Sequence, residues 1–551
     1  MKKRFISLLL PLCLVLSLFA LASCGAGEDG IYTITFSING EKTKIEVPEG
    51  EIPVCPEELL SWETSEHYYK VTGWDKEIVP AKRNATYTAT VGEYGLTIYE
   101  VLFVLPSGIV EVKTHEGEIP TPPKGYETDD TKEYRIGSFK EWDKELTAPT
   151  AANTENGKKK MSYTPIYTYK PLYVAKLLAA KDGAKGIFTM TYDDGIYPTA
   201  KWVNAKNKIY GTKGSCMMIP NHNENAPNFG NRVSEWNAIF SDGTLEPECH
   251  SMTHGLVLPS EKWSSFEGSK YNNTQENYDV ELVQSKAFIE AAFPGHTVLC
   301  LAPSNNTLST YSFQSDGNGG YVRVDDGGAQ AVANATYFAI RQGERGAQSL
   351  DPTFDANPGG WYNLYIRSFF SSTYTQEEKL ANGKKWLDET VRNGYWMIGM
   401  CHGINGSGAS TSGDLTTENA EALFKYASNY IESGELWAAT FGEATKYIRE
   451  RQNTTVSERY EENIVYVDMT INRKTADGKI LDEEVFNYPL TVEVRVPDTW
   501  KNVRYTDGGE QKFAPVYTRD GASFAMVNLT PGKNGVTVTT PIYIYAKPTA
   551  N

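Results

Sequence analysis

Residues 186–195 read Gly-Ile-Phe-Thr-Met-Thr-Tyr-Asp-Asp-Gly, a short apolar run that stops at two adjacent aspartates. The run predicts a strand over 186–192 that is covered on both faces. Because successive side chains of a strand point to opposite faces, Asp193 and Asp194 can share one site only where the strand ends and turns. Gly195 permits such a turn. The plain alternative is a turn whose aspartate caps the next helix.

The surrounding region, residues 171–451, alternates strand-like and helix-like segments. Apolar runs at 298–302 and 396–401 predict two more buried strands, and 275–293 predicts a helix. The alternation predicts an α/β domain, either a barrel or a doubly wound sheet. The side chains expected to face inward from the helix are Val280, Leu282, Val283, Phe288 and Ile289.

Three histidines complete a constellation that can carry chemistry. His250 and His254 are four residues apart, which on a helical turn places both imidazoles on one face. His402 follows the apolar run at 396–401. Two histidines and one carboxylate form a metal site with open positions, and a second carboxylate beside it can act as general base. Each piece alone also fits an ordinary structural role, so their joint order is what favours a site.

These motifs resemble a known family. Residues 191–195 are similar to the Thr-Phe-Asp-Asp-Gly signature of polysaccharide deacetylases, the NodB-homology domain of carbohydrate esterase family four. Residues 250–254 match that family's second histidine motif. Residues 395–402 resemble its late strand ending in histidine, and residues 436–443 its closing strand and helix. The resemblance spans 171–451 and implies a distorted (β/α) barrel of about seven strands.

The resemblance also implies roles for individual residues. Asp194, His250 and His254 would bind a divalent metal, usually zinc. Asp193 would be the general base that takes a proton from the attacking water, and His402 the general acid that protonates the leaving group.

One family feature is missing. The third motif often has an arginine shortly before a proline and an aromatic residue, whereas residues 301–305 here read Leu-Ala-Pro-Ser-Asn. Arg341 is a candidate replacement from another strand, with a structural ion pair as the alternative. Pro303, Arg341 and Trp361 are the candidate substrate-binding residues, although Trp361 fits a buried core position equally well.

The N-terminus has the pattern of an export signal. Residues 1–4 are basic after the initiator methionine, residues 5–22 are almost wholly apolar, and Leu21-Ala-Ser precedes Cys24. This resembles the lipobox of bacterial lipoproteins, which implies cleavage after residue 23 and a lipid on Cys24. We therefore expect a protein held on the outer face of a bacterial cell membrane. The alternative is an uncleaved membrane anchor.

Two tandem repeats follow. Residues 49–53, Glu-Gly-Glu-Ile-Pro, recur at 116–120, and residues 74–77, Trp-Asp-Lys-Glu, recur at 142–145. The copies resemble InlB B-repeat modules of bacterial surface proteins, which implies small β-grasp-like spacers. The two modules are predicted over 31–92 and 96–170.

Beyond residue 451 the pattern is that of an all-β region. Apolar and polar residues alternate over 490–496, which predicts a half-buried strand, and 452–551 as a whole predicts a β-sandwich. Five cysteines remain after Cys13 and Cys24, too few for a disulfide scaffold, so most are expected to be buried thiols. A bridge between Cys216 and Cys249 is left open.

Charge narrows the class of partner. Acidic residues outnumber basic ones by 69 to 53, giving a formal net charge of −16, which excludes a nucleic-acid partner because such a surface repels phosphates. The 34 tyrosines and 11 tryptophans fit either strand composition or sugar stacking.

Three functions remain, and in each of them the protein acts on a carbohydrate or binds one. The first is a surface-anchored, metal-dependent deacetylase of an N-acetylated polysaccharide or oligosaccharide. The second is an acetylxylan-type O-acetyl esterase on the same scaffold, and the third a non-catalytic carbohydrate-binding protein. Amide hydrolysis fits slightly better than ester hydrolysis, because an amine leaves only when it is protonated, which is the role expected of His402. No protein partner is predicted.

Overall fold

The chain divides into two compact units, residues 1–170 and 171–551. The computed structural model describes residues 30–152, 154, 160–220, 232–254, 273–342, 346–350, 360–409, 414–533 and 535–539. The expected signal segment and Cys24 lie outside these residues, as does the end of the β region from residue 540. Among the helices described, none has both the length and the apolar composition needed to cross a bilayer.

The first unit begins with a five-stranded sheet in the order β2-β1-β5-β4-β3. Its strands are β1 (Ile31–Ile38), β2 (Glu41–Pro48), β3 (Ser61–Glu63), β4 (Tyr68–Trp74) and β5 (Ala85–Tyr94). The first strand pairs antiparallel with β2 and parallel with β5. The chain thus places its first and last strands side by side at the centre of the sheet.

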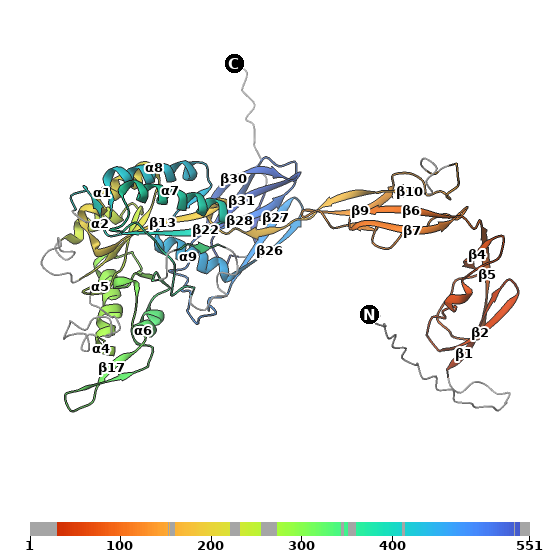
Figure 1. The fold of residues 1–551 in the computed structure, drawn as a ribbon, viewed down its shortest axis with the longest axis horizontal. Helices are drawn as coiled ribbons and strands as arrows, with labels where there is room; N and C mark the ends of the chain where they lie inside the picture. The colour runs from red at the N-terminus through yellow and green to blue at the C-terminus, as the bar shows by residue number, and fades with distance from the viewer. Residues whose placement is uncertain are drawn as a thin grey trace, which may run out of the picture. The chain divides into compact units, whose positions relative to one another are not determined.

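The second half of the unit repeats this connection (Figure 1). Strand β6 pairs antiparallel with β7 and parallel with β10, while β8, β9 and β11 form a second small sheet. The strands are β6 (Ile98–Leu105), β7 (Gly108–His115), β8 (Thr128–Asp129), β9 (Arg135–Trp142), β10 (Lys160–Tyr163) and β11 (Pro165–Pro171).

The repeated tryptophans occupy the same place in both halves. Phe36 packs against Trp74 with ring centroids 4.9 Å apart, and Phe103 packs against Trp142 at 5.1 Å. Each phenylalanine is fully buried. The aromatic residues that recur along the chain therefore serve as cores of small β modules, which accounts for part of the aromatic content without sugar binding.

The aspartate that follows each tryptophan also makes the same bond twice. The amide of Thr88 donates to Asp75 Oδ1 at 2.8 Å, and the amide of Thr164 donates to Asp143 Oδ1 at 2.9 Å. Each bond fastens the turn after the tryptophan strand to the last strand that carries the module's core tyrosine. The sequence repeat is thus a repeat of contacts.

The second unit is built on a mostly parallel sheet in the order β19-β16-β15-β14-β13-β22-β20, with β21 paired to β22 and β25 to β13. Only β20 runs antiparallel to its neighbour β22 among these pairs. The strands are β13 (Gly186–Tyr192), β14 (Gly214–Met218), β15 (Leu245–Cys249), β16 (Cys300–Leu301), β19 (Ala339–Ile340), β20 (Gln348–Ser349), β21 (Arg367–Ser368), β22 (Tyr395–Cys401) and β25 (Leu436–Ala438).

The sequence resemblance implied a distorted (β/α) barrel of about seven strands, and this sheet differs from that expectation. It has nine strands, and its two ends, β19 and β20, do not pair with each other in the part of the chain that the structure describes. The sheet therefore curls as an open half-barrel. Strand β13 is central and buried along its whole length, as its continuous apolar run predicts.

Helices flank the sheet, and Figure 1 shows α7 and α8 side by side along it. Thr375 begins α7 with a capping box, and Thr440 does the same for α9. The helices are α1 (Tyr197–Tyr210), α2 (Val233–Phe240), α4 (Gln275–Tyr278), α5 (Ser285–Ala292), α6 (Gly328–Thr336), α7 (Gln376–Asn393), α8 (Thr417–Glu432) and α9 (Phe441–Gln452).

The helix expected over 275–293 is interrupted. Residues Asp279–Gln284 form a π-helical segment between α4 and α5. A π turn contains more residues than an α turn, so the face that packs inward shifts after it. Leu282 and Ile289 are buried as expected, but Val283 is 37% exposed and Phe288 49% exposed. The prediction that Val283 and Phe288 face inward was therefore wrong.

The C-terminal β region forms two sheets, β12-β28-β31-β30-β29 and β26-β27-β32. Strand β12 (Ala175–Leu177) comes from before β13 in the chain, so the boundary at 451 does not separate the two regions cleanly. The other strands are β26 (Thr454–Glu461), β27 (Ile464–Ile471), β28 (Leu490–Val496), β29 (Asn502–Asp507), β30 (Glu510–Arg519), β31 (Ala522–Leu529) and β32 (Val536–Val538).

Strand β28 is buried on both faces, not on one as its alternation predicted. The amide of Asp182 donates to Thr491 Oγ1 at 2.8 Å, and Arg495 donates to the carbonyl of Ser523 at 3.0 Å. The polar side chains of the strand are thus covered by other parts of the unit. Val492 also shares one apolar core with Trp396 of the α/β sheet. The β region and the α/β region therefore pack as a single unit.

The five described cysteines, Cys55, Cys216, Cys249, Cys300 and Cys401, are all buried and free. The bridge left open between Cys216 and Cys249 does not form. Burial raises the pKa of the Cys216 thiol, so this side chain remains a protonated apolar group.

Candidate functional site

The predicted site residues follow neighbouring parallel strands. Asp193 and Asp194 come directly after β13, His250 after β15 and His402 after β22. Because these strands are parallel, their carboxyl ends meet at one edge of the sheet. This is the edge at which open α/β sheets bind ligands.

Asp194, His250 and His254 converge on one point. Their potential ligand atoms all lie within 4.8 Å of one another. Asp194 Oδ1 is 3.5 Å from His250 Nε2 and 3.6 Å from His254 Nε2. The two imidazole rings have centroids 5.0 Å apart. All three predicted metal ligands are therefore brought together.

The two histidines converge through a loop and not through the helical turn that their spacing suggested. Ser251 and His254 both have positive φ, at 70° and 59°, and Asp194 has a φ of 67°. Left-handed backbone is unfavourable for such residues and persists only where the surroundings hold it in place. Two of the three candidate ligands therefore sit on strained backbone, which is a common property of binding sites.

Glu281 holds this loop. Its carboxylate accepts hydrogen bonds from the Thr253 amide at 3.0 Å and the Thr253 hydroxyl at 2.5 Å, and its backbone carbonyl accepts from the Met252 amide at 3.0 Å. Glu281 is buried and belongs to the π-helical segment. The irregularity in that helix thus coincides with the residue that fixes the loop between the two histidines, which fits the tendency of π segments to occur at functional sites.

The orientation of His250 suits metal binding. Its Nδ1 lies 2.5 Å from the carbonyl oxygen of Ala302, so this nitrogen donates its proton there and Nε2 faces Asp194 without one. A backbone carbonyl behind a histidine is a usual second partner in metal sites. Pro303, proposed to contact substrate, is buried directly after this carbonyl.

The charges of the cluster are mutually stabilising. Burial alone would raise the pKa of Asp194, but His250, His402 and His254 lower it to about 2. Burial alone would lower the pKa of His250, but the carboxylates of Asp193 and Asp194 raise it. The carboxylate therefore stays ionised through the physiological range.

Arg341 forms the ion pair that the sequence left open. It is fully buried, its Nη2 contacts Asp193 Oδ1, and Asp193 is only 4% exposed. Arg341 Nη1 also lies 3.4 Å from Asn306 Oδ1. The other oxygen of Asp193 faces His250 Nε2 at 3.9 Å. Arg341 thus compensates the charge of Asp193 and leaves one carboxylate oxygen turned toward the metal ligands.

His402 has a partner that sequence reasoning missed. Asp414 is buried, and its carboxylate accepts hydrogen bonds from the backbone amides of His402 at 3.0 Å and Gly403 at 3.4 Å. Its Oδ2 lies 3.6 Å from His402 Nδ1, an ion-pair contact too long for a hydrogen bond. Burial alone would lower the pKa of His402, but Asp414, Asp193 and Asp194 raise it. No motif surrounds Asp414, so the sequence carried no signal for it.

Trp361 does not join the site. It is 5% exposed and packs in the core, with the Arg449 guanidinium 4.2 Å above its ring. This corrects its proposed place as the wall of a sugar subsite. The tryptophan instead helps bury a cation that pairs with Asp477 at 2.9 Å.

The residues present fit a divalent metal. One carboxylate and two imidazoles form the donor set of many catalytic zinc sites, in which the remaining positions bind water or substrate. Their ligand atoms lie close enough to share one ion. The Ala302 carbonyl, which binds the other ring nitrogen of His250, is also in place.

Comparisons with known proteins give partial likenesses. No family model matches the chain. A gellan lyase of a Bacillus species is 27% identical over 364 residues, which cover 65% of this chain but 13% of that protein. The chain therefore spans only about an eighth of this relative's length.

Similar solved structures are carbohydrate esterases and deacetylases. A family 4 acetyl xylan esterase from Clostridium thermocellum in complex with a cobalt ion is 13% identical, covers 47% of this chain and 89% of its own, and has a TM-score of 0.27. The Bc1960 peptidoglycan N-acetylglucosamine deacetylase is 9% identical, covers 49% and 91%, and has a TM-score of 0.28. At such TM-scores the likeness by itself decides neither the fold nor the reaction.

Proposed function

We propose that the chain is a metal-dependent hydrolase that removes acetyl groups from an N-acetylated polysaccharide or oligosaccharide. The observation that carries the proposal is the convergence of Asp194, His250 and His254 beside a buried Asp193–Arg341 pair. The motif resemblance to polysaccharide deacetylases supports it, because the residues of its first two motifs are the ones that meet.

A divalent ion such as zinc, held by Asp194, His250 and His254, would supply a Lewis acid for the acetyl carbonyl and would lower the pKa of water. Asp193 turns one oxygen toward these ligands while Arg341 contacts the other. In the proposed reaction Asp193 takes the proton of the attacking water. Arg341 does not touch the reacting atoms and acts as a positioning residue that fixes the Asp193 carboxylate.

His402 then protonates the leaving group. It lies at the end of β22 and is partly exposed, and Asp414 and the two aspartates of the site raise its pKa although burial opposes them. An amine leaves only when it is protonated, whereas an alkoxide departs more readily. A histidine whose pKa is raised therefore fits N-deacetylation better than ester hydrolysis.

We also propose that the protein is held at the outer face of the cell membrane through a lipid on Cys24. The support is the sequence pattern of residues 1–24. The two β modules would then serve as spacers between the anchor and the hydrolytic unit. Among their described residues no group of three metal-ligating side chains occurs.

The deciding experiment is acetate release from N-acetylated chitooligosaccharides and from O-acetylated xylooligosaccharides, by zinc-loaded protein with and without a chelator. We expect release that the chelator abolishes. Asp193→Asn is expected to slow it by about 10²–10⁴-fold, the usual contribution of a general base. His250→Ala is expected to abolish zinc binding measured by calorimetry.

His67→Ala is the matched control, because His67 is an exposed histidine of the first unit, 42% exposed at its side chain. It should leave zinc binding and acetate release unchanged. Faster release from the chitooligosaccharide supports an amidase, and faster release from the xylooligosaccharide identifies the esterase instead. Zinc-loaded protein that releases acetate from neither substrate would refute the enzymatic proposal.

A further inference from the structure

A cavity of about 560 Å³ lies beside the site and plays no part in the mechanism above. Its lining residues are Tyr197, Pro198, Lys201, Trp202, Arg232 and Ser407.

This cavity is close to the candidate metal ligands. Tyr197 begins α1 three residues after Asp194, which limits their Cα atoms to about 10 Å apart. Ser407 follows His402 by five residues, and its hydroxyl is 3.3 Å from that of Thr199 in the first turn of α1. A short oligosaccharide that is bound at the metal ligands can therefore extend into the cavity.

The lining combines aromatic rings with cations. The guanidinium of Arg232 lies 4.8 Å above the ring of Tyr197, and Lys201 is exposed one helical turn further along. Among the described residues that line the cavity, none has a carboxylate. Arg232 does pair with Glu235 at 2.9 Å, but both side chains are exposed, 38% and 47%, so the pair is weak and easily replaced.

The backbone adds to this positive character. Tyr197 is the first residue of α1, and Arg232 is the N-cap of α2, so two helices begin at the cavity. The first turn of α1 carries no acidic residue, and its N-cap, Ile196, makes no side-chain capping bond. Helix N-termini favour negative charge.

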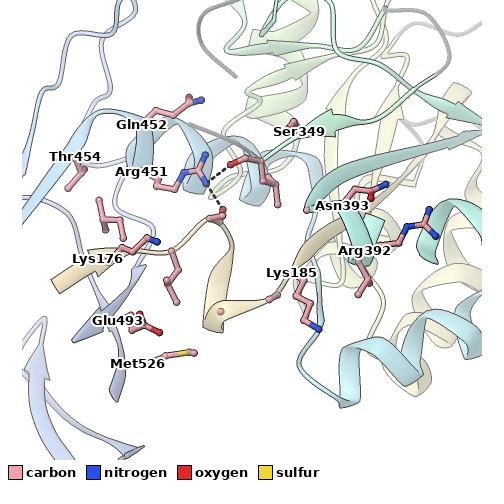
Figure 2. Close-up of a pocket in the computed structure, with 18 of the residues that line it drawn as sticks. Lys176, Lys185, Ser349, Arg392, Asn393, Arg451, Gln452, Thr454, Glu493 and Met526 are labelled. Atoms are coloured by element: carbon pink, nitrogen blue, oxygen red, sulfur yellow. Dashed lines mark hydrogen bonds between the residues drawn. The ribbon is translucent and has the colours of Figure 1, made fainter. Parts of the chain in front are cut away.

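A larger cavity of about 940 Å³, shown in Figure 2, makes an informative contrast. It lies where α7 and α9 end, and helix C-termini disfavour an anion. Two of its cations are already engaged. Arg451 donates to the carbonyls of Ala179 and Leu350, and Arg519 makes two bonds to Glu493 at 2.8 Å (Figure 2 draws the Arg451 bonds).

We propose that the cavity beside α1 is a subsite for a sugar that carries a carboxylate, so that the preferred substrate is an acetylated glycan containing uronic acid residues. This deepens the proposed function and rests on it. Tyr197 and Trp202 offer faces for the apolar side of a pyranose, and Lys201 and Arg232 bind the carboxylate. Because the chain carries a net charge of −16, an acidic glycan is repelled over much of the surface and is drawn to this patch.

The test compares N-acetylated chitooligosaccharides with N-acetylated oligosaccharides of the same length in which glucuronic acid replaces every second sugar. We expect kcat/KM for acetate release to be about tenfold higher when glucuronic acid is present, the effect of one charge-assisted contact, and to fall toward the value for the neutral oligosaccharide at high salt. In the double variant Lys201→Gln, Arg232→Gln the ratio of the two kcat/KM values should approach one. Lys208→Gln is the control, because Lys208 also belongs to α1 but pairs with Asp242 at 2.6 Å. It should keep the wild-type ratio.

A binding assay separates this inference from the proposed reaction. Tryptophan fluorescence follows titration with a non-acetylated xylooligosaccharide bearing glucuronic acid, which needs no turnover. The subsite is supported if the wild-type protein binds this oligosaccharide more tightly than the unbranched one and the double variant loses that preference. This holds even if no acetate is released. Equal affinity for the branched and unbranched oligosaccharides, or full binding by the double variant, overturns it.

Discussion

Glu450 offers a direct test of the electrostatics of the fold. It lies in α9, where the helix packs against the C-terminal β region, and its side chain is fully buried. The amide of Tyr488 donates to its Oε2 at 3.1 Å, whereas Oε1 has no hydrogen-bond partner among the described residues. Burial raises the pKa of Glu450 to about 8, although the Tyr488 amide, Arg473 and Lys446 oppose the shift.

The size of the effect follows from the two pKa values. With an ordinary value of 4.5, the unfolded chain loses this proton well before the folded chain does. The stability associated with protonated Glu450 is therefore fully present below pH 4.5 and is lost as the pH rises through about 8. The free energy of unfolding is therefore lowered, relative to its value below pH 4.5, by at most about 3 kcal/mol at pH 7 and at most about 5 kcal/mol above pH 9.

The change Glu450→Gln removes the titration and keeps the shape of the side chain. We expect the variant to match wild type within about 1 kcal/mol at pH 5 and to exceed its free energy of unfolding by about 3 kcal/mol at pH 7. Urea unfolding, followed by tryptophan fluorescence and circular dichroism at pH 5, 7 and 9, measures this. The control is Glu483→Gln, which alters an exposed carboxylate. A Glu450→Gln advantage that is absent, or that does not grow with pH, would refute the reasoning.

Three further predictions concern the site and its surroundings. Zinc at a hundredfold excess over its dissociation constant should stabilise the protein by about 2.7 kcal/mol, seen as a rise in Tm that a chelator reverses. Asp414→Asn should lower the pKa of His402, because the Asp414 carboxylate helps to raise it, so the alkaline limb of the pH–rate profile should move to lower pH; an unmoved limb would contradict the role of His402 as acid. Gly442→Ala should destabilise the protein, because a Cβ there would lie 3.0 Å from carboxylate oxygens of both Glu246 and Glu248, and an unchanged unfolding midpoint would show that these groups relax freely.

The sequence predicted β13 and β22 closely, because a continuous apolar run has few other uses in an α/β region. It also selected the three residues that meet at the candidate metal site. It did not predict how they meet. The spacing of four between His250 and His254 suits a helix, but the strained loop that the structure has there depends on Glu281, which lies 27 residues further along the chain than His254.

Other features depend on contacts between distant segments, which no local pattern reveals. Asp193 is paired with a residue 148 positions away, so the arginine missing from the third motif could only be guessed at as Arg341. Strand β28 alternates like a surface strand, yet both of its faces are covered, because α9 and the segment around Asp182 pack against it. In each case the tertiary neighbours outweigh the local periodicity.

The parallel pairing of β1 with β5 and of β6 with β10 has a mechanical consequence. A pull on the two ends of a module draws β1 from its beginning and β5 from its end, in opposite directions along a shared ladder. The same holds for β6 and β10 in the second module. All hydrogen bonds of such a ladder are loaded together in shear and do not open one after another. We therefore expect each module to behave under tension as a stiff, force-bearing link whose lifetime is set by its unfolding rate.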